Sequence, residues 1–363
     1  MKNKLIICIS VYLALIACNK QAGNINPIPN ASNRLELYYP GTASWETVTP
    51  ASLGWNETGL NDVYTYLQQK NTKAFIILKK GKIVAEKYFG TFTADSNWYW
   101  ASAGKTMTAF LVGIAQEQGK LNINNKTSQY IGTGWTSLPL EKENLITVKH
   151  QLTMTSGLND GVADVDCTLP SCLQYKADAG SRWAYHNAAY TLLDKVIENA
   201  TNTNYNTYFQ QKIRDRIGMN GLWVRVGYNN VYFSTARSMA RFGLLMLSKG
   251  KWDEITILTD TNYINTQTNS TQSLNPSYGY LTWLNGKGFY MLPTVQLLFT
   301  GNLFPNAPPD TYAALGKDDQ KIYVVPSQQL VIIRMGESAG QTQLALSSFD
   351  NELWGKLKAA AVF

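Results

Sequence analysis

The chain has 363 residues, of which 45% are hydrophobic and 16% are charged, a composition typical of a globular protein with a large core. The formal net charge is +7, but there is no long basic run and no nucleic-acid-binding motif, so we expect no nucleic-acid partner. The only histidines are His150 and His186, and no H-x-H or H-E-x-x-H pattern occurs, so we expect neither a catalytic metal nor a cofactor.

The N-terminus has the pattern of a bacterial export signal. A short basic segment precedes the apolar stretch 5–17, which is too short to span a bilayer. This stretch ends in L-I-A-C, which resembles the bacterial lipobox, in which the cysteine (here Cys18) becomes the lipidated first residue of the mature protein. We therefore expect a signal peptide over 1–17 and a polar tether over 18–49. The alternative is an ordinary cleaved signal peptide with an incidental cysteine.

Both interpretations of the N-terminus predict export. The lipoprotein interpretation adds a membrane partner, because the lipid on Cys18 would hold the protein on a membrane, facing the periplasm or the cell surface. No later segment has 18 consecutive apolar residues, so we expect no membrane span after the signal.

Two further cysteines, Cys167 and Cys172, lie close together in a polar loop. In an oxidising compartment such a pair predicts a small disulfide loop, whereas two free thiols are the alternative. A metal site would need more ligands than this neighbourhood offers.

The predicted elements begin with a helix over Leu60–Lys70 and two strands, 74–78 and 82–88, which a turn at Lys80–Gly81 joins into a hairpin. The next predicted helix, over 102–119, is apolar almost all round, as is typical of a buried helix. From about 120 to 250 we expect mainly helices, over 148–155, 188–200, 205–217 and 235–248.

Strand patterns return near residue 276. The expected strands are 279–284, 288–292, 320–325 and 330–335, and a last helix is expected over about 347–360.

This order predicts an α+β fold in a single domain over 50–363. An antiparallel sheet lobe, flanked by terminal helices, would come from the two ends of the domain (about 50–115 and 255–363). A helical lobe (about 116–254) would be inserted between them. The cleft between the lobes is the expected site.

The motif G-x-S-x-G at Gly336–Gly340 follows an apolar strand, as the nucleophile elbow of an α/β-hydrolase does. That fold needs its histidine after the serine in the chain. No histidine follows His186, and the alternating strand–helix units of the fold are missing. We therefore do not expect Ser338 to be the nucleophile.

The better candidate nucleophile is Ser102, in the run S-A-G-K that ends at Lys105. At the start of a helix, residues three apart share a face, so the hydroxyl and the amine can meet. Unpaired N–H groups at a helix N-terminus favour developing negative charge, and burial lowers the pKa of a lysine toward that of a usable base. A second S-x-x-K, Ser248–Lys251, lies at a predicted helix C-terminus, where a structural role explains the lysine.

The triplet Tyr185–Asn187 supplies the second candidate element. A phenol near an ammonium group can act as a base toward the serine, and Asn187 can hold a substrate carbonyl or orient the lysine. The Y-x-N pattern also occurs at 228–230 and 263–265, and a buried structural tyrosine is the alternative for Tyr185. Between Tyr185 and Asn187, His186 is expected to point away into a structural hydrogen bond.

Together these segments resemble the serine β-lactamases, the penicillin-binding proteins and their esterase relatives. Trp100–Gly113 resembles their S-x-x-K helix, and 183–187 with 190–193 resembles their Y-x-N loop and the helix after it. Further similar segments, in the same order and spacing, are 152–158, 234–243, 314–316 and 320–326. Within the group the chain is most similar to class C β-lactamases, family VIII esterases and 6-aminohexanoate-dimer hydrolase.

The resemblance implies a β-lactamase/transpeptidase-like fold and a Ser-Lys-Tyr site. Ser102 would attack a carbonyl, Lys105 and Tyr185 would move its proton, and water would release the acyl-enzyme. The oxyanion would lie between the Ser102 N–H and an N–H near Lys317 on the edge strand, which Gly316 ends.

One departure from the family concerns the substrate. The K-T-G of β-lactamases and cell-wall peptidases is missing, and the corresponding turn reads G-K-D-D over 316–319. Two aspartates beside Lys317 would oppose an anionic substrate, so an ester, a small amide or a peptide-like molecule is expected. The alternatives are a D,D-peptidase or β-lactamase, and a non-catalytic surface-binding lipoprotein of the same fold.

Overall fold

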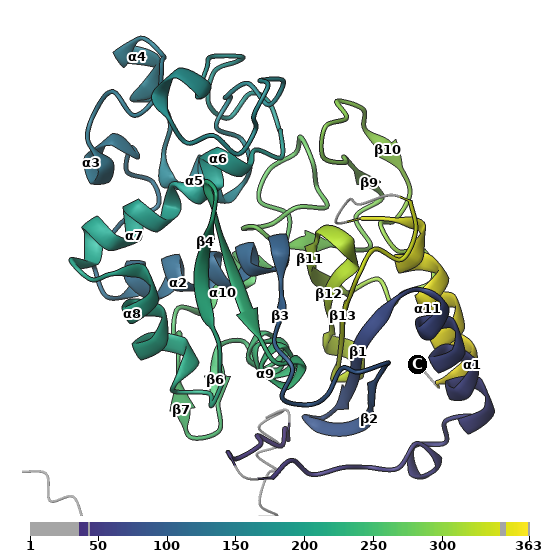
Figure 1. Cartoon of the computed structure of the whole chain (residues 1–363). Coiled ribbons are helices and arrows are strands. Elements are labelled where there is room, and N and C mark those ends of the chain that lie inside the picture. Colours follow the sequence, from purple (N-terminus) through teal and green to yellow (C-terminus); the bar gives the residue numbers. More distant parts are fainter. Residues whose placement is uncertain (1–35, 43, 342–345, 362–363) are drawn as a thin grey trace, which may run out of the picture. The chain divides into compact units, whose positions relative to one another are not determined.

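A six-stranded antiparallel sheet, built from both ends of the chain, forms the centre of the computed structural model (Figure 1). The model describes residues 36–42, 44–341 and 346–361, so the predicted signal peptide and Cys18 lie outside the described residues. The strand order is β2-β1-β13-β12-β11-β8. The strands span Lys82–Tyr88 (β2), Thr72–Lys79 (β1), Leu330–Gly336 (β13), Gln320–Val325 (β12), Tyr312–Gly316 (β11) and Trp283–Leu284 (β8).

The central strands are apolar on both faces because helices cover both faces. Ile76 pairs with Ile333 across β1 and β13, and every residue of β12 and β13 is buried. Helices α1 (Glu57–Gln69) and α11 (Ser348–Ala360) pack together on one side, and α9 (Ala236–Leu247) contacts β1, β12 and β13 on the other (Figure 1). The predicted sheet lobe with its terminal helices is therefore confirmed.

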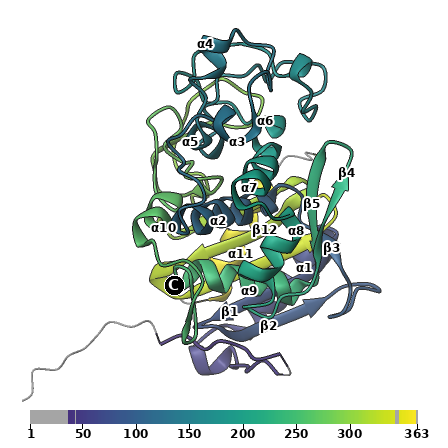
Figure 2. The same ribbon diagram turned by 90° about the vertical axis from the view of Figure 1, so that its left-hand side faces the viewer.

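Helix α2 (Gly104–Glu117) connects the sheet to the second lobe. It contacts β11 of the main sheet and α7 (Leu193–Thr201) of the other lobe, and Figure 2 shows it below α7 and near β12. All of its residues from Gly104 to Ala115 are buried, as the apolar pattern predicted.

The second lobe contains short helices and long loops. Besides α7, this region contains α3 (Ser128–Ile131), α4 (Leu140–Glu143), α5 (Val148–Leu152), α6 (Asn187–Thr191) and α8 (Tyr205–Phe209). Helix α10 (Thr261–Gln267) comes later in the chain. The helix expected over 188–200 is divided at Leu192, and the one expected over 205–217 continues beyond Phe209 in π-helical turns over Gln210–Arg214.

A three-stranded sheet, order β3-β5-β4, was not predicted in this region. It combines Trp98–Tyr99 (β3) with the hairpin Leu222–Val226 (β4) and Asn229–Ser234 (β5). Its apolar residues gave little signal because several of them, such as Leu222 and Val226, are exposed, while Trp223 and Tyr232 are buried. The structure also has two pairs of short strands: Lys251–Trp252 (β6) with Ile255–Thr256 (β7), and Phe289–Tyr290 (β9) with Phe299–Thr300 (β10).

The segment before residue 50 already belongs to the folded unit. The Tyr38 N–H donates to the Lys80 carbonyl at 2.9 Å, and the Val48 N–H donates to the Ile83 carbonyl at 2.8 Å. The Trp45 indole N–H donates to the Gly81 carbonyl at 2.8 Å. Residues 38–42 and 44–48, which the sequence assigned to the tether, therefore lie along the β1–β2 hairpin.

Candidate active site

Ser102 lies in a tight turn, Ala101–Ala103, directly before α2. Ala101 has φ +48°, a left-handed conformation that costs energy for a residue with a side chain and is found preferentially at functional sites. The turn is anchored by buried Trp100, whose indole N–H donates to the Ser234 hydroxyl at 2.8 Å and whose backbone N–H donates to the Tyr232 carbonyl. The small unpredicted sheet therefore holds the residues around Ser102 in place.

Gly316, at the end of β11, packs against the same turn. A Cβ atom on Gly316 would lie 2.3 Å from the Trp100 carbonyl oxygen and 3.0 Å from the Ala103 nitrogen. Only a glycine allows the edge strand to approach so closely. The structure thus brings Gly316 and Ser102, which are far apart in the sequence, into one site.

Lys105 lies in the first turn of α2 and is 4% exposed. Its Nζ atom is 3.8 Å from the centre of the Tyr190 ring and 5.5 Å from the centre of the Tyr185 ring. Burial lowers the Lys105 pKa to about 7, although the charges of Asp166 and Asp194 act in the opposite direction. A lysine in this state is protonated in only part of the molecules near neutral pH, as a general base requires.

Tyr185 reaches Ser102 from the other lobe. Its ring stacks on Trp283 at an interplanar angle of 15°, and it meets Tyr278 and Trp183 edge-on or tilted. Burial raises the Tyr185 pKa, and a hydrogen bond with the Ser102 side chain opposes this shift without cancelling it. Tyr185 is therefore a neutral phenol near pH 7, and Lys105 is the group that can take a proton.

Asn187 begins α6 and is held by the neighbouring loop. Its Nδ2 donates to Asp166 at 2.8 Å, while its Oδ1 is buried with no hydrogen-bond partner among the described residues. His186 is the N-cap of α6, and its Nδ1 accepts the Ala189 N–H at 3.3 Å. As expected, this histidine has a structural hydrogen bond.

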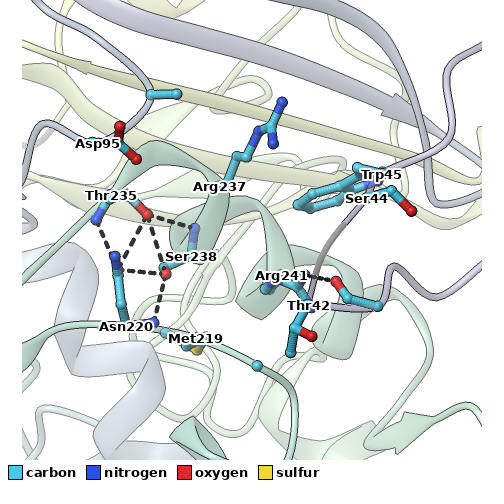
Figure 3. Close-up of a pocket in the computed structure, with 13 residues that line it drawn as sticks. Thr42, Ser44, Trp45, Asp95, Met219, Asn220, Thr235, Arg237, Ser238 and Arg241 are labelled. Carbon is cyan, nitrogen blue, oxygen red and sulfur yellow. Dashed lines mark hydrogen bonds between the residues drawn. The ribbon is translucent and has the colours of Figure 1, made fainter.

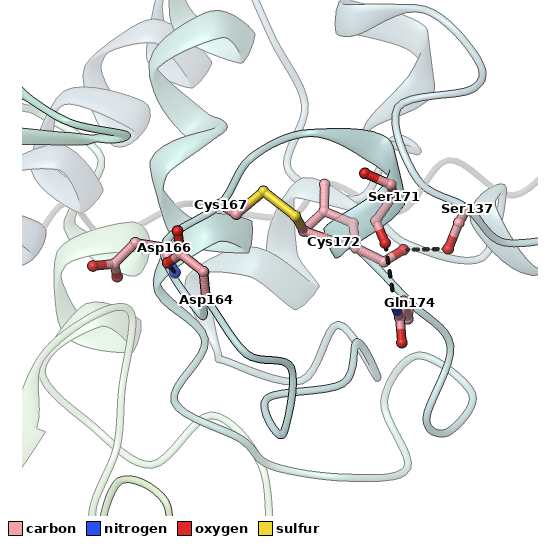
Figure 4. The surroundings of a disulfide bond; sticks show 8 residues. Ser137, Asp164, Asp166, Cys167, Ser171, Cys172 and Gln174 are labelled. Atoms are coloured by element: carbon pink, nitrogen blue, oxygen red, sulfur yellow. Dashed lines mark hydrogen bonds between the residues drawn. A yellow bond between two sulfur atoms is a disulfide. The ribbon is translucent and has the colours of Figure 1, made fainter.

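The loop that carries Asp166 is closed by the Cys167–Cys172 disulfide (Figure 4). Asp166 directly precedes Cys167, and the Val165 carbonyl accepts the Ala188 N–H at 3.1 Å. The segment directly before the disulfide therefore contacts the first turn of α6, at Asn187 and Ala188.

The turn after Gly316 differs from the expectation in one respect. Lys317 is exposed, as a substrate contact requires, but neither aspartate is free beside it. Asp318 accepts the Tyr99 hydroxyl at 2.8 Å, and buried Asp319 is 3.1 Å from the Lys321 amine. A phenol hydrogen bond does not neutralise a carboxylate, so only the pairing of Asp319 with Lys321 weakens the electrostatic argument against an anionic substrate.

The two other serine motifs have structural explanations. The Ser338 hydroxyl donates to the Gly340 carbonyl at 2.7 Å, and the Ser248 hydroxyl donates to the Leu245 carbonyl at 3.0 Å. Lys251 is exposed on a short strand.

Four residues of the site's surroundings were not identified from the sequence: Tyr190, Asp166, Asp194 and Trp283. For Asp194 a signal existed, because a carboxylate stands one turn after Tyr190 in a helix whose other face is apolar. The other three reach the site only through tertiary packing.

A polar cavity of about 250 Å³ lies elsewhere, between α9 and the segment around Trp45 (Figure 3). None of the predicted site residues lines it. Within it Asn220, Thr235 and Ser238 bond one another, and Arg241 donates to the carbonyls of Pro40 and Ile217. These contacts make the cavity a junction that fixes the segment before β1.

Among residues 36–42, 44–341 and 346–361, no group of three or more His, Cys, Asp or Glu side chains could hold a metal ion. Within the same ranges, no helix is both long enough and apolar enough to cross a membrane.

An antiparallel sheet from both chain ends, covered by terminal helices and joined to a second lobe through a buried helix, is the β-lactamase/transpeptidase-like fold. A model of the beta-lactamase family matches residues 65–349. The chain therefore belongs to the beta-lactamase family, whose members and structural neighbours include hydrolases.

Solved structures share this fold at low sequence identity. A candidate 6-aminohexanoate-dimer hydrolase from Bacillus anthracis superposes with a TM-score of 0.67 at 17% identity, covering 89% of each chain. A candidate beta-lactamase from Bacteroides dorei gives 0.64 at 17% identity, covering 83% of this chain and 98% of that one. A penicillin-binding protein homologue from Caulobacter crescentus gives 0.62 at 13% identity, covering 84% and 98%.

Among curated proteins, the chain is similar to Protein flp of Staphylococcus aureus, with 24% identity over 157 residues. The match covers 37% of this chain and 31% of that protein, so the chain matches about a third of the relative's length.

Proposed function

We propose that this protein is a serine hydrolase that cleaves ester or amide bonds through an acyl-enzyme on Ser102. The observation that carries the proposal is the meeting of three groups: a half-buried serine in the turn before α2, a buried lysine in the first turn of α2, and a tyrosine hydrogen-bonded to that serine. These groups can activate a hydroxyl without a histidine or a metal.

In the proposed reaction, the Ser102 Oγ attacks the substrate carbonyl carbon while its proton passes to Lys105. The tetrahedral intermediate collapses and the bond to the leaving group breaks. The Lys105 ammonium protonates that group, either directly or through the phenol of Tyr185, which takes a proton back from Lys105. Water then attacks the acyl-enzyme, which releases the acid and restores Ser102. The N–H groups of Ser102 and Lys317 are the proposed oxyanion donors, each worth about 3 kcal/mol.

The proposal is tested by hydrolysis of p-nitrophenyl acetate and butyrate by the folded domain and by its Ser102→Ala variant. We expect turnover that the variant loses by at least about a hundredfold, because no other group replaces the nucleophile. Equal turnover by both proteins would contradict the mechanism. A Ser102 that does not react with a fluorophosphonate, in a protein that still binds a ligand, would favour the non-catalytic alternative.

A second candidate, cleavage of carboxylate-bearing substrates such as cell-wall peptides or penicillins, gains support from the exposed Lys317 and from the pairing of Asp319 with Lys321. Nitrocefin hydrolysis and covalent labelling by a fluorescent penicillin distinguish it. Opening of nitrocefin that Lys317→Gln weakens would establish this candidate, and inert nitrocefin beside active esters would exclude it.

We also propose that the protein is exported and held on a membrane through a lipid on Cys18. The proposal is supported by the basic segment, the apolar stretch and the L-I-A-C pattern. Labelled palmitate should enter the full chain but not its Cys18→Ala variant, and labelling of neither protein would refute the anchor.

A further inference from the structure

Asp194 is a carboxylate buried next to the proposed site that the mechanism above does not use. Its side chain is 3% exposed. One oxygen, Oδ2, accepts the Asn230 amide at 3.0 Å and lies 3.4 Å from the Arg225 guanidinium. The other, Oδ1, is buried with no hydrogen-bond partner among the described residues. A carboxylate needed only for the Arg225 contact would not have to be buried in this way.

Asp194 and Lys105 lie next to the same buried tyrosine. The Lys105 Nζ is 3.8 Å from the Tyr190 ring centre. Tyr190 is one helical turn before Asp194. Leu192 keeps a helical backbone where α6 meets α7, so Tyr190 and Asp194 lie on the same helical face. The Tyr190 hydroxyl is in turn 3.1 Å from Thr108, which lies one turn after Lys105 on α2.

Two acidic groups act on Lys105, and Asp194 is the one that is fully buried. Asp166 acts on Lys105 from the disulfide loop, but it is only partly buried and is bonded to Asn187. Tyr185 and Tyr190, which also contact the amine, have raised pKa values because they are buried, and so they are neutral.

Around Asp194 itself, burial raises the pKa to about 7, and Arg225, Asn230 and Lys105 limit the rise. Glu198 and Tyr205 are its other ionisable neighbours, and Tyr205 is neutral because burial raises its pKa. Lys105 and Asp194 therefore titrate as a coupled pair near neutral pH.

We propose that Asp194 is a positioning residue of the Ser102 reaction, whose carboxylate stabilises the ammonium that forms when Lys105 takes the Ser102 proton. The inference rests on the proposed function. The proton moves from the Ser102 Oγ to the Lys105 Nζ and later leaves with the alcohol or amine, so Asp194 itself neither gains nor loses one. Because Lys105 is buried, a nearby negative charge stabilises its ammonium form and so favours this transfer.

The test compares the pH dependence of kcat/KM for p-nitrophenyl butyrate in the wild type and in Asp194→Asn. The variant keeps the shape and loses the charge, so the Lys105 pKa should fall. The acid limb of the profile should move to lower pH by about one unit. The plateau value of kcat/KM should also fall, because a weaker base accepts the proton less well. A purely structural role would lower the plateau without moving the limb.

Two controls sharpen this test. Asp178→Asn removes an exposed carboxylate that pairs with Lys142, and it should leave the profile unchanged. Arg225→Gln changes a residue that is 54% exposed, which should allow folding even if Asp194→Asn does not fold. Without Arg225, the Asp194 carboxyl is protonated more readily and stabilises the Lys105 ammonium less. The acid limb should therefore again move to lower pH, but by less than in Asp194→Asn.

A direct titration separates failure of this inference from failure of the proposed function. The Lys105 amine is followed by NMR of ¹³C-labelled lysine, with Lys105→Met identifying its signal. A lower Lys105 pKa in Asp194→Asn or Arg225→Gln supports the inference even in a protein that hydrolyses no ester. An unchanged Lys105 pKa, or an unmoved acid limb in an active variant, would overturn it.

Discussion

Burial shifts the pKa values of Lys105 and Tyr185 in opposite directions. Burial disfavours the charged form of each group, so it lowers the pKa of the amine and raises that of the phenol. In the proposed mechanism Lys105 is therefore the proton acceptor for Ser102, and Tyr185 is a hydrogen-bond partner that can also donate. The motifs alone allowed either residue to be the base.

Gly316→Ala tests the close approach of the edge strand to Ser102. The new methyl group would meet the Trp100 carbonyl at 2.3 Å, a backbone atom that cannot swing away. We expect β11 to shift and ester hydrolysis to fall by about tenfold to a hundredfold, because a small displacement of the oxyanion donors is costly. Steady-state kcat/KM measures the effect.

Gly340→Ala is the matched control, because a Cβ atom at Gly340 meets nothing within 4 Å. It should retain wild-type kcat/KM. Full activity in Gly316→Ala would show that β11 does not help to form the site.

At the scale of the element, the turn after β11 depends on an arginine from another strand. Asp318 and Asp319 both have φ +58°, a conformation that aspartate adopts at some cost. Buried Arg334, on β13, donates to the carbonyls of Asp318 at 2.9 Å and Asp319 at 3.1 Å. It thereby fixes the backbone that positions Lys317.

Arg334→Met should destabilise the protein strongly. Besides the two turn carbonyls, Arg334 bonds the Thr72 hydroxyl and the carbonyls of Lys70 and Glu337, and all five acceptors would lose their donor. We expect a loss of about 3 kcal/mol or more in the free energy of unfolding, measured by urea denaturation.

Arg237→Met is the matched control. The Arg237 side chain is 44% exposed and forms an ion pair with Glu86. The substitution should cost about 1 kcal/mol or less. Similar losses in the two variants would refute the role given to the buried arginine.

At the scale of the whole molecule, a buried ionic cluster joins the terminal helix to the sheet. The Lys321 amine on β12 is 3.1 Å from Asp319 and 2.9 Å from Asp350, which belongs to α11. Asp319 also accepts the Ser347 hydroxyl and the Ala339 N–H. The cluster is fully buried, so losing Asp319 removes one of the two carboxylates that compensate the Lys321 charge, together with the acceptor of two further hydrogen bonds.

This cluster predicts how stability depends on pH. Burial by itself raises the Asp319 pKa, but Lys321 and the hydrogen bonds outweigh it and hold the pKa below its usual value. As the pH falls below about 4, the unfolded chain therefore takes up this proton before the folded protein does. The stabilisation from Asp319 is complete above that pH and is lost as the pH falls toward the folded-state pKa.

Asp319→Asn should thus lower the free energy of unfolding by about 3 kcal/mol at pH 7. The difference from the wild type should shrink as the pH drops below about 4. Unfolding by urea at several pH values measures it. Glu337→Gln, which removes a carboxylate that is 62% exposed, should have little effect at any pH. A pH-independent loss in Asp319→Asn would show that the carboxylate charge is not responsible.

The sequence by itself determined the elements with strong periodicity and the sites set by local geometry. Strand bounds over 82–88 and 320–325 agree with the structure, and Ser102 and Lys105 are brought together by one turn of helix. The partly exposed hairpin β4–β5 and the packed segments 38–42 and 44–48 were missed, because short or partly exposed segments carry little hydrophobic pattern.

Only the tertiary structure decided the rest of the site. Tyr185 was selected among three Y-x-N triplets by context and resemblance, and its contact with Ser102 exists because the second lobe packs on α2. The close packing of Gly316 and the burial of Lys105 beside Asp194 depend likewise on segments distant in the chain. Helical spacing is encoded locally, whereas burial and charge environment arise only when separate elements pack together.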